Sequence, residues 1–234
     1  NTSFLPFEPM RVELDSFSFQ QSASDISWLI THLGLKIKIT VSLAKKDVLE
    51  RWSLSVSNLG KTRRNISIYP YFSIGYMSWM NQSAYFNDEL NAIVASGVTP
   101  YQKVSQYFKN KDLKDKTFFI ADKKPTAWHA KQASFEGEGG LHNPDALYNS
   151  TLTNEDARYE TPVAVLQYRE TLEVNNSVEY QFLFGPAKDE MEIELLGDKY
   201  FGVEKSQQAQ QAYDDYIAQG QGCLTINTNE PEFD

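Results

Sequence analysis

Hydrophobic and polar residues alternate with a period of two through most of residues 11–58. The clearest example is "LKIKITVSL", residues 35–43, in which the aliphatic side chains fall on one side and Lys, Thr and Ser on the other. This alternation is typical of an antiparallel strand with one face on a core and one in water. The same pattern predicts strands at "RVELDSFSF", "ISWLITHL" and "VLERWSLSVSN".

Two short links with turn-forming residues separate further strands. The link "NLGKTRRN", residues 58–65, precedes "ISIYPYFSI", so we expect a strand, a turn and a strand, with Pro70 at an edge or a bulge. Asn175 and Asn176 separate "VAVLQYRETLEV" from "VEYQFLFGPA", which predicts a final hairpin. Strands are also expected at "KTFFIAD" and "TAWHAKQASF".

The alternation is lost in two segments and then gives way to a helical pattern. Residues 77–116 predict a long loop with short helical pieces at "DELNAIVAS" and "YQKVSQYF", and residues 136–162 predict a second irregular excursion. After Pro186 the chain is rich in helix formers, which predicts one or two helices. We therefore expect a β-domain over residues 1–186 and a helical linker over residues 187–234.

The amino-acid composition disfavours several classes of function. The formal net charge is −9, from 22 Lys and Arg against 31 Asp and Glu, which disfavours a nucleic-acid or anionic-membrane partner. Cys223 is the only cysteine, so an internal disulfide and a multi-cysteine metal site are excluded within these residues. No apolar run approaches the ~20 residues of a membrane span, and no leader pattern is visible. These features favour the cytoplasm.

Motifs for nucleophilic, metal or nucleotide chemistry are absent from the sequence: there is no G-x-S-x-G, H-E-x-x-H, P-loop or dinucleotide fingerprint. Glycoside cleavage needs two carboxyl groups, and Glu136 with Glu138, or Asp88 with Glu89, supply the residue type. Nothing in the sequence fixes their separation, so a solvated acidic loop is the better interpretation. The three histidines are far apart in the sequence: His32, His129 and His142.

The stretch "YFSIGYMSWMNQSAYFND", residues 71–88, combines aromatic side chains with side-chain amides. Sugar sites use both, because aromatic faces cover C–H groups and planar amides meet hydroxyls, but protein interfaces are enriched in the same aromatics. Core packing or an interface is favoured over a direct sugar contact. A smaller candidate of the same kind is "TPYQKV", residues 99–104.

Three longer runs carry a resemblance to a known family. They are "ERWSLSVSNLGKTRRNISIYPYFSIGYMSWMNQSAYFND", "ARYETPVAVLQYRETLEVNNSVEYQFLFGPAKDE" and the terminal "GCLTINTNEPEFD". The chain resembles the N-terminal part of glycoside hydrolase family 94, the inverting glycoside phosphorylases formerly placed in glycosyltransferase family 36, and is most similar to the cellobionic acid phosphorylase branch. The resemblance covers nearly the whole chain, although the first strands of the usual sandwich are missing from it.

The resemblance implies a mainly β fold, an antiparallel β-sandwich (supersandwich) with a C-terminal helical linker that leads to an (α/α)6 catalytic barrel. It implies that inorganic phosphate attacks the anomeric carbon of a short β-glucoside, cellobionic acid or cellobiose, and gives α-glucose 1-phosphate. The general-acid Asp of the family lies beyond this chain, so we expect no catalytic residue here, no cofactor besides phosphate as co-substrate, and no activity of the chain alone. It also implies a homodimer.

Six residues are our candidates for substrate contacts. Gln102 and Lys103 are the first choice, because an aldonate acceptor needs a nearby amide and cation. The second choices, more typical of an interface, are Tyr76, Trp79, Asn81 and Gln82. The alternative function is a stand-alone, non-catalytic carbohydrate-binding or dimerisation module.

Overall fold

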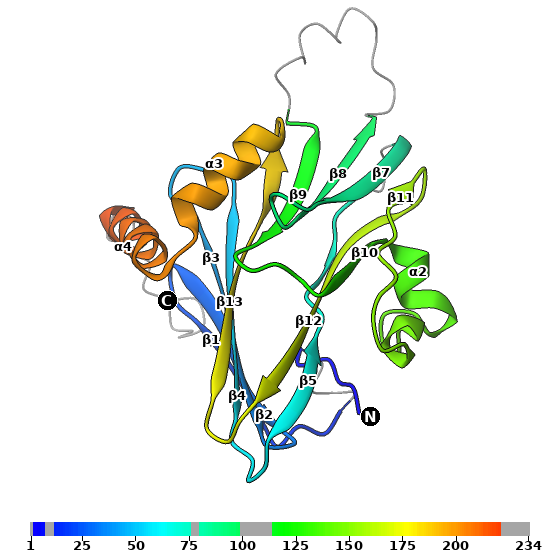
Figure 1. Cartoon of the computed structure of the whole chain (residues 1–234). Coiled ribbons are helices and arrows are strands. Elements are labelled where there is room, and N and C mark those ends of the chain that lie inside the picture. Colours follow the sequence, from blue (N-terminus) through cyan, green and yellow to red (C-terminus); the bar gives the residue numbers. More distant parts are fainter. Residues whose placement is uncertain (1, 8–11, 76–79, 99–113, 221–234) are drawn as a thin grey trace, which may run out of the picture.

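The computed structural model describes residues 2–7, 12–75, 80–98 and 114–220, and its described strands form two antiparallel sheets (Figure 1). The larger sheet has nine strands, in the order β1 (Ser16–Gln21), β2 (Asp25–His32), β3 (Leu35–Leu43), β4 (Glu50–Asn58), β13 (Ser177–Ala187), β9 (Lys116–Ala121), β8 (Ala92–Val98), β7 (Met80–Asn87) and β11 (Ala157–Arg158). In the smaller sheet, β12 (Pro162–Leu172) pairs with β10 (Ala127–Lys131), β5 (Arg64–Ile68) and β6 (Tyr71–Ser73).

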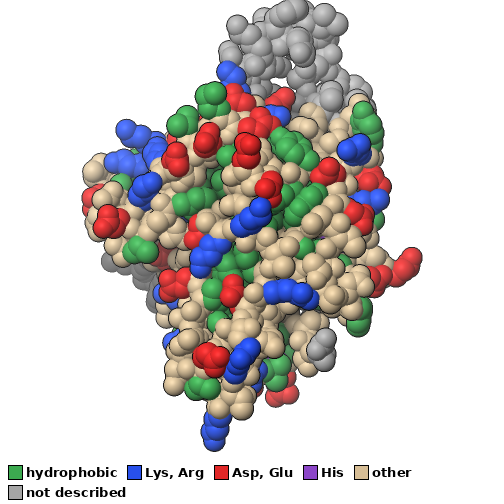
Figure 2. Space-filling model, in the orientation of Figure 1, with side chains coloured by type: hydrophobic (Ala, Val, Ile, Leu, Met, Phe, Trp, Pro, Cys, Tyr) green, Lys and Arg blue, Asp and Glu red, His purple; other side chains and the backbone are tan. Residues whose placement is uncertain are grey.

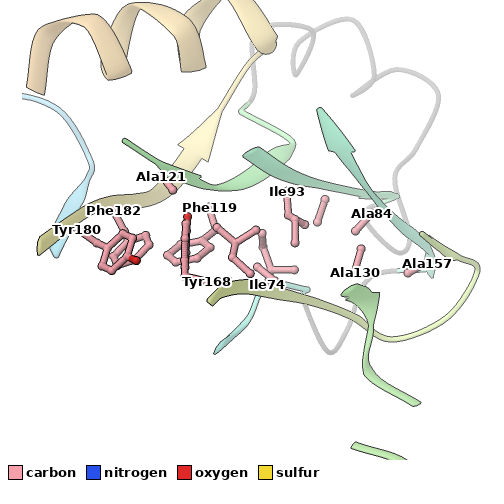
Figure 3. Packing of buried hydrophobic residues seen from close by; sticks show 13 residues of the cluster. Ile74, Ala84, Ile93, Phe119, Ala121, Ala130, Ala157, Tyr168, Tyr180 and Phe182 are labelled. Carbon is pink, nitrogen blue, oxygen red and sulfur yellow. The ribbon is translucent and has the colours of Figure 1, made fainter. Parts of the chain in front are cut away.

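The main core lies between the two sheets. Figure 3 shows Phe119, Phe182 and Ile93 of the large sheet facing Tyr168 of the small sheet, and all four side chains are buried. Burying an aromatic or branched aliphatic side chain contributes about 1.5–3 kcal/mol, so this layer accounts for much of the stability of the fold. The prediction of an antiparallel β-sandwich is confirmed.

The alternation of hydrophobic and polar residues in the first strands correctly predicts which side chains are buried. Leu35, Ile37 and Ile39 of β3 are buried, whereas Lys36 and Lys38 between them are exposed. These buried residues join a second apolar cluster with residues of β2, β4 and β12. The outer face of this part of the large sheet is polar, as an antiparallel sheet with one wet face requires.

Helices cover the outer faces of both sheets. The predicted C-terminal helices are confirmed as α3 (Glu190–Tyr200) and α4 (Val203–Gly220). Asp189 caps α3 by accepting a hydrogen bond from the Glu192 amide at 2.9 Å, and Ile193 packs on the large sheet. On the small sheet, α2 (Gln132–Glu136) and the 3-10 helix η2 (Asp145–Tyr148) contribute to a separate apolar cluster, and the 3-10 helix η1 (Gly137–Gly139) lies between them in sequence.

The prediction of a loop over residues 77–116 is wrong where the structure describes it, because β7 and β8 form a paired hairpin there. Residues 92–95 are all buried: Ile93 and Ala95 face the small sheet, and Ala92 and Val94 face α3. Burial on both faces removes the alternation that marks a strand. The second expected helical piece, residues 101–108, lies outside the described residues.

The strand predicted over residues 126–135 is shorter than expected. The strand β10 ends at Lys131, and Gln132 begins α2, whose Phe135 packs into the cluster on the outer face of the small sheet.

The strand, turn and strand predicted around residues 58–65 are confirmed as β4 and β5, although the two strands lie in different sheets, whereas the hairpin predicted at residues 175–176 is wrong because that link crosses from one sheet to the other. The strand β4 pairs with β3 and β13, while β5 pairs with β12; likewise β12 and β13 lie in different sheets. Asn58 is fully buried and holds the two links together. Its Nδ2 donates to the carbonyl oxygens of Thr62, Leu172 and Glu173, at 2.9, 3.0 and 3.3 Å.

Candidate functional site

The two described binding candidates belong to one end of the sandwich, the upper end in Figure 1, where β7 begins and β8 ends. Asn81 and Gln82 are on β7. The backbones of Met80 and Val98 pair in the β7–β8 ladder, and in the sequence these two residues border the ranges 76–79 and 99–113. The remaining four candidates lie outside the described residues: Tyr76, Trp79, Gln102 and Lys103.

A β-bulge sets the geometry of Asn81. The ladder pairs Ser83 with Ser96 and then Met80 with Val98, so Asn81 and Gln82 together lie opposite Gly97. Asn81 has a φ of 53°, in the left-handed region, and its side chain is exposed. Asn tolerates this conformation better than most residues. The bulge therefore presents an amide to solvent at the end of the sheet.

Gln82 instead packs into the structure. Its Oε1 lies 2.4 Å from the position that a Cβ on Gly75 would take, and Pro162 Cγ lies 2.6 Å from the same position. Only glycine fits at residue 75. The gap beside this contact is lined by Ile74, Gly75, Gln82, Ala95, Ser96, Asp115 and Thr117 and has no room for a water-sized molecule. It therefore offers no space for a disaccharide.

Charged groups tie the N-terminus of α3 to the same end of the sheet. Tyr85 donates its hydroxyl hydrogen bond to Glu190, Lys116 Nζ lies 3.6 Å from Glu190 Oε1, and Lys114 pairs with Glu192. Burial and the adjacent Glu190 carboxylate raise the pKa of Tyr85 to about 12. The hydrogen bond from Tyr85 lowers the pKa of Glu190. Each charge has a partner, so the network positions α3.

One member of each carboxylate pair considered for glycoside cleavage, Glu136 and Asp88, has a structural partner. Glu136 Oε1 accepts from the Tyr71 hydroxyl at 2.5 Å and from Gln132 Nε2 at 3.0 Å. Burial, followed by this contact with Glu136, raises the pKa of Tyr71. Asp88 pairs with Lys124 at 2.9 Å. Within the described residues, no group of three or more His, Cys, Asp or Glu side chains is placed to hold a metal ion.

His129 is a buried structural residue. Its Nε2 accepts from the backbone amide of Thr153 at 3.0 Å and lies 2.9 Å from the Thr153 hydroxyl, which fastens residues 153–155 to β10. Burial lowers the pKa of His129, so the ring is neutral near pH 7. His32 is likewise buried, with its ring 4.8 Å from that of Phe4, whereas His142 is exposed.

One residue pair beside Asn81 was missed by the sequence analysis. Arg158 ends β11 and pairs with Ser83 of β7, and Tyr159 follows with a φ of 57°. A left-handed tyrosine is a conformational outlier, and this one is 77% exposed. No sequence motif marks such a residue, because its backbone conformation follows from contacts on both sides of it.

Basic and acidic side chains are interspersed on the face of the molecule shown in Figure 2. This mixture offers no broad basic area on that face for a nucleic-acid backbone, in line with the net charge of −9. No helix in the described ranges is long and apolar enough to cross a membrane.

The fold and the comparison with known families agree. The sequence profile described as "Glycosyl hydrolase 94, supersandwich domain" matches residues 5–203, most of the chain. The chain therefore belongs to glycosyl hydrolase family 94 and contains its supersandwich domain, which confirms the resemblance noted in the sequence.

Among individual relatives, the cellobionic acid phosphorylase of Neurospora crassa is 49% identical over 229 residues, which cover 98% of this chain and 29% of that protein. The solabiose phosphorylase of Paenibacillus borealis is 23% identical over 76% of this chain and 23% of its own length. A 3-O-beta-D-glucopyranosyl-beta-D-glucuronide phosphorylase from the same organism is 22% identical over 80% of this chain and 24% of its own length. The chain thus spans less than a third of each relative.

Proposed function

We propose that this chain is the N-terminal β-sandwich and linker of an inverting glycoside phosphorylase that acts on a short β-glucoside, with cellobionic acid ahead of cellobiose. The observation that carries this proposal is the 49% identity to the Neurospora crassa cellobionic acid phosphorylase over 98% of the chain. Identity to the phosphorylases for solabiose and for the glucosyl glucuronide is 23% and 22%. The difference favours the cellobionic acid specificity.

In the proposed reaction, a phosphate oxygen bonds to the anomeric carbon of the glucosyl unit while the bond from that carbon to the bridging oxygen breaks. The bridging oxygen takes a proton from a general-acid Asp and leaves as the hydroxyl of gluconate. Attack from the opposite face converts the β-glucoside into α-glucose 1-phosphate. That Asp belongs to the proposed catalytic barrel outside this chain, so the chain alone is expected to be inactive.

The role of this chain would be to support the barrel and the acceptor side of the site. We propose a sandwich domain over residues 1–186, a linker over residues 187–234, a homodimer and a cytoplasmic location, with no cofactor besides the co-substrate phosphate. Gln102 and Lys103 remain the first candidates for an aldonate contact. Among the second choices, Gln82 is better suited to packing than to a sugar contact, since it already lies against Gly75.

An assay of the full-length protein that contains this chain tests the proposal. Incubation with cellobionic acid or cellobiose, with and without inorganic phosphate, should release glucose 1-phosphate only with phosphate, and faster from cellobionic acid. Release of free glucose without phosphate would contradict phosphorolysis. Binding of oligosaccharide with no cleavage would favour the alternative, a non-catalytic carbohydrate-binding or dimerisation module.

A further inference from the structure

Tyr159 has a backbone conformation that disfavours its own side chain. Its φ of 57° brings Cβ close to the neighbouring carbonyl oxygen, a clash that glycine would avoid. The side chain is 77% exposed, so little core packing offsets this strain. For folding alone, glycine would be the better residue at this position. A strained, exposed aromatic residue is therefore a reason to look for a role outside the fold.

Both neighbours of Tyr159 are fixed. On one side, Ala157 and Arg158 pair with Ala84 and Ser83 of β7. On the other side, Lys131 Nζ lies 2.8 Å from Glu160 Oε1, and the Gln132 amide donates to the Thr161 carbonyl at 3.1 Å. The backbone at Tyr159 is thus held in position before any ligand arrives, which lowers the backbone entropy lost on binding.

Arg158 and Asn81 bring complementary groups to the same sheet edge. The side chain of Arg158 is exposed and forms no ion pair with another described residue. Its ladder partner Ser83 is two residues from Asn81, which is also exposed and left-handed, at a φ of 53°. A guanidinium without an ion pair among the described residues, an aromatic ring and an amide therefore lie along the same edge, on β11, directly after β11 and on β7 respectively.

These three groups match the chemistry of a sugar acid. A guanidinium pairs with a carboxylate through two parallel hydrogen bonds, an aromatic face covers the C–H face of a sugar, and an amide meets hydroxyls. We propose that Arg158 and Tyr159, with Asn81 beside them, contact the carboxylate-bearing acceptor end of an aldonic-acid disaccharide. This inference rests on the proposed function and adds residues that determine specificity. The remainder of that pocket is expected from parts of the enzyme beyond the described residues.

Steady-state kinetics of the full-length enzyme test the inference through two substitutions. Arg158→Ala should raise the KM for cellobionic acid about tenfold, because a charge-assisted contact is lost, and leave cellobiose unaffected because it has no carboxylate. Tyr159→Gly should raise the KM for both substrates about threefold to tenfold. The melting temperature of Tyr159→Gly should stay the same or rise, because the strain is relieved.

Matched variants separate a ligand contact from a general effect. Tyr148 is 76% exposed and is not left-handed, so Tyr148→Ala controls for the loss of a surface tyrosine. Asn175 has a φ of 62° at the opposite end of the sandwich, so Asn175→Gly controls for the relief of strain. Both should leave the KM values unchanged. Arg158→Lys keeps the charge without the planar fork and should fall between wild type and Arg158→Ala.

The outcomes distinguish this inference from the proposed function. If the wild-type enzyme cleaves cellobionic acid with phosphate and both substitutions leave its KM within about twofold, the inference is wrong and the function stands. If the wild-type enzyme phosphorolyses neither disaccharide, the proposed function is wrong and the inference falls with it. A lower melting temperature for Tyr159→Gly would contradict the argument from strain.

Discussion

The two ends of the sandwich differ in the hydrogen bonds and the exposure of their polar residues. At the end of the sandwich where β4 passes to β5, the lower end in Figure 1, the side chain of the fully buried Asn58 bonds both links between the sheets. Its backbone N–H also donates to the Asn176 carbonyl at 2.9 Å. At the upper end, the Thr117 hydroxyl is buried with no hydrogen-bond partner among the described residues, and Asn81 and Tyr159 are left-handed and exposed. Among the described residues, unpartnered buried atoms occur at both ends, since His32 Nδ1 and Arg64 Nε at the lower end also lack a partner, and Leu33 and Asn175 there are left-handed and exposed as well. The ends differ in that a buried side-chain amide joins the two links at the lower end.

We therefore expect the stability of the fold to depend more on the lower end of the sandwich and ligand binding to depend more on the upper end. Buried polar groups that bond one another specify the sheet crossing, and removing one leaves its partners without water or protein contacts. The strained exposed residues Asn81 and Tyr159 add nothing comparable to folding, so their effect should be seen in binding. Substitutions at the lower end should therefore change the free energy of unfolding most.

The largest effect is expected from Asn58→Ala. Alanine removes the donor to three carbonyl oxygens and leaves a small cavity, so the free energy of unfolding should fall by about 3–5 kcal/mol. Asn65→Ala is the control, because Asn65 is exposed and its Oδ1 only accepts from Thr171 at 2.8 Å. Chemical denaturation measures both; a loss below about 1 kcal/mol for Asn58→Ala would break the comparison.

Gly75→Ala should be the next largest change, and it tests packing at the upper end. The new Cβ would lie 2.4 Å from Gln82 Oε1 and 2.6 Å from Pro162 Cγ, and the proline ring cannot rotate away. We expect a loss of about 1–3 kcal/mol in unfolding free energy. Gly220→Ala is the control, since no atom lies within 4 Å of its added Cβ. Equal stability of the two variants would show that the Gln82 contact is not as tight as described.

Thr117→Val should have a smaller effect of opposite sign. Valine keeps the shape and removes a buried hydroxyl that has no described partner, so the free energy of unfolding should rise by about 0.5–1 kcal/mol. Thr171→Val is the matched control, because Thr171 donates to Asn65 and should lose a few tenths of a kcal/mol, about 0.5 at most. Destabilisation by Thr117→Val would mean that this hydroxyl is hydrogen-bonded and would weaken the contrast between the ends.

The smallest effect concerns pH and His129. Burial lowers its pKa in the folded protein below the ordinary 6.5, so between these two values the unfolded chain binds more protons than the folded one. Stability from this group is therefore present above pH 6.5 and is lost as the pH falls through that window. His129→Gln should flatten the dependence of unfolding free energy on pH between about 7 and 5. An unchanged slope would assign the acid sensitivity to other groups.

Local pattern predicted much of the β-fold but not how its strands connect across the sheets. The alternation of Leu35 through Ile39 fixes which face of β3 is buried. Ile93 and Val94 are buried on opposite faces of β8, so a half-wet strand pattern could not reveal them. Asn58 looks like a turn residue in sequence, and only the tertiary structure shows that it joins two sheets.

The candidate site could be predicted only in part from the sequence, because composition marks residue types but not their contacts or backbone conformations. Amide and aromatic composition drew attention to residues 71–88, which include Asn81 at the bulge. Gln82 has the same chemistry but packs against Gly75, a contact that composition does not encode. Tyr159 is distinguished by its backbone conformation, which depends on β7 on one side and on Lys131 with Gln132 on the other.

The most direct test of the functional account is proton NMR of the sugar phosphate formed from cellobionic acid by the full-length enzyme. The account predicts α-glucose 1-phosphate and gluconate in equal amounts, because phosphate attacks the β-glucoside with inversion. The β-anomer, or free glucose formed without uptake of phosphate, would contradict it.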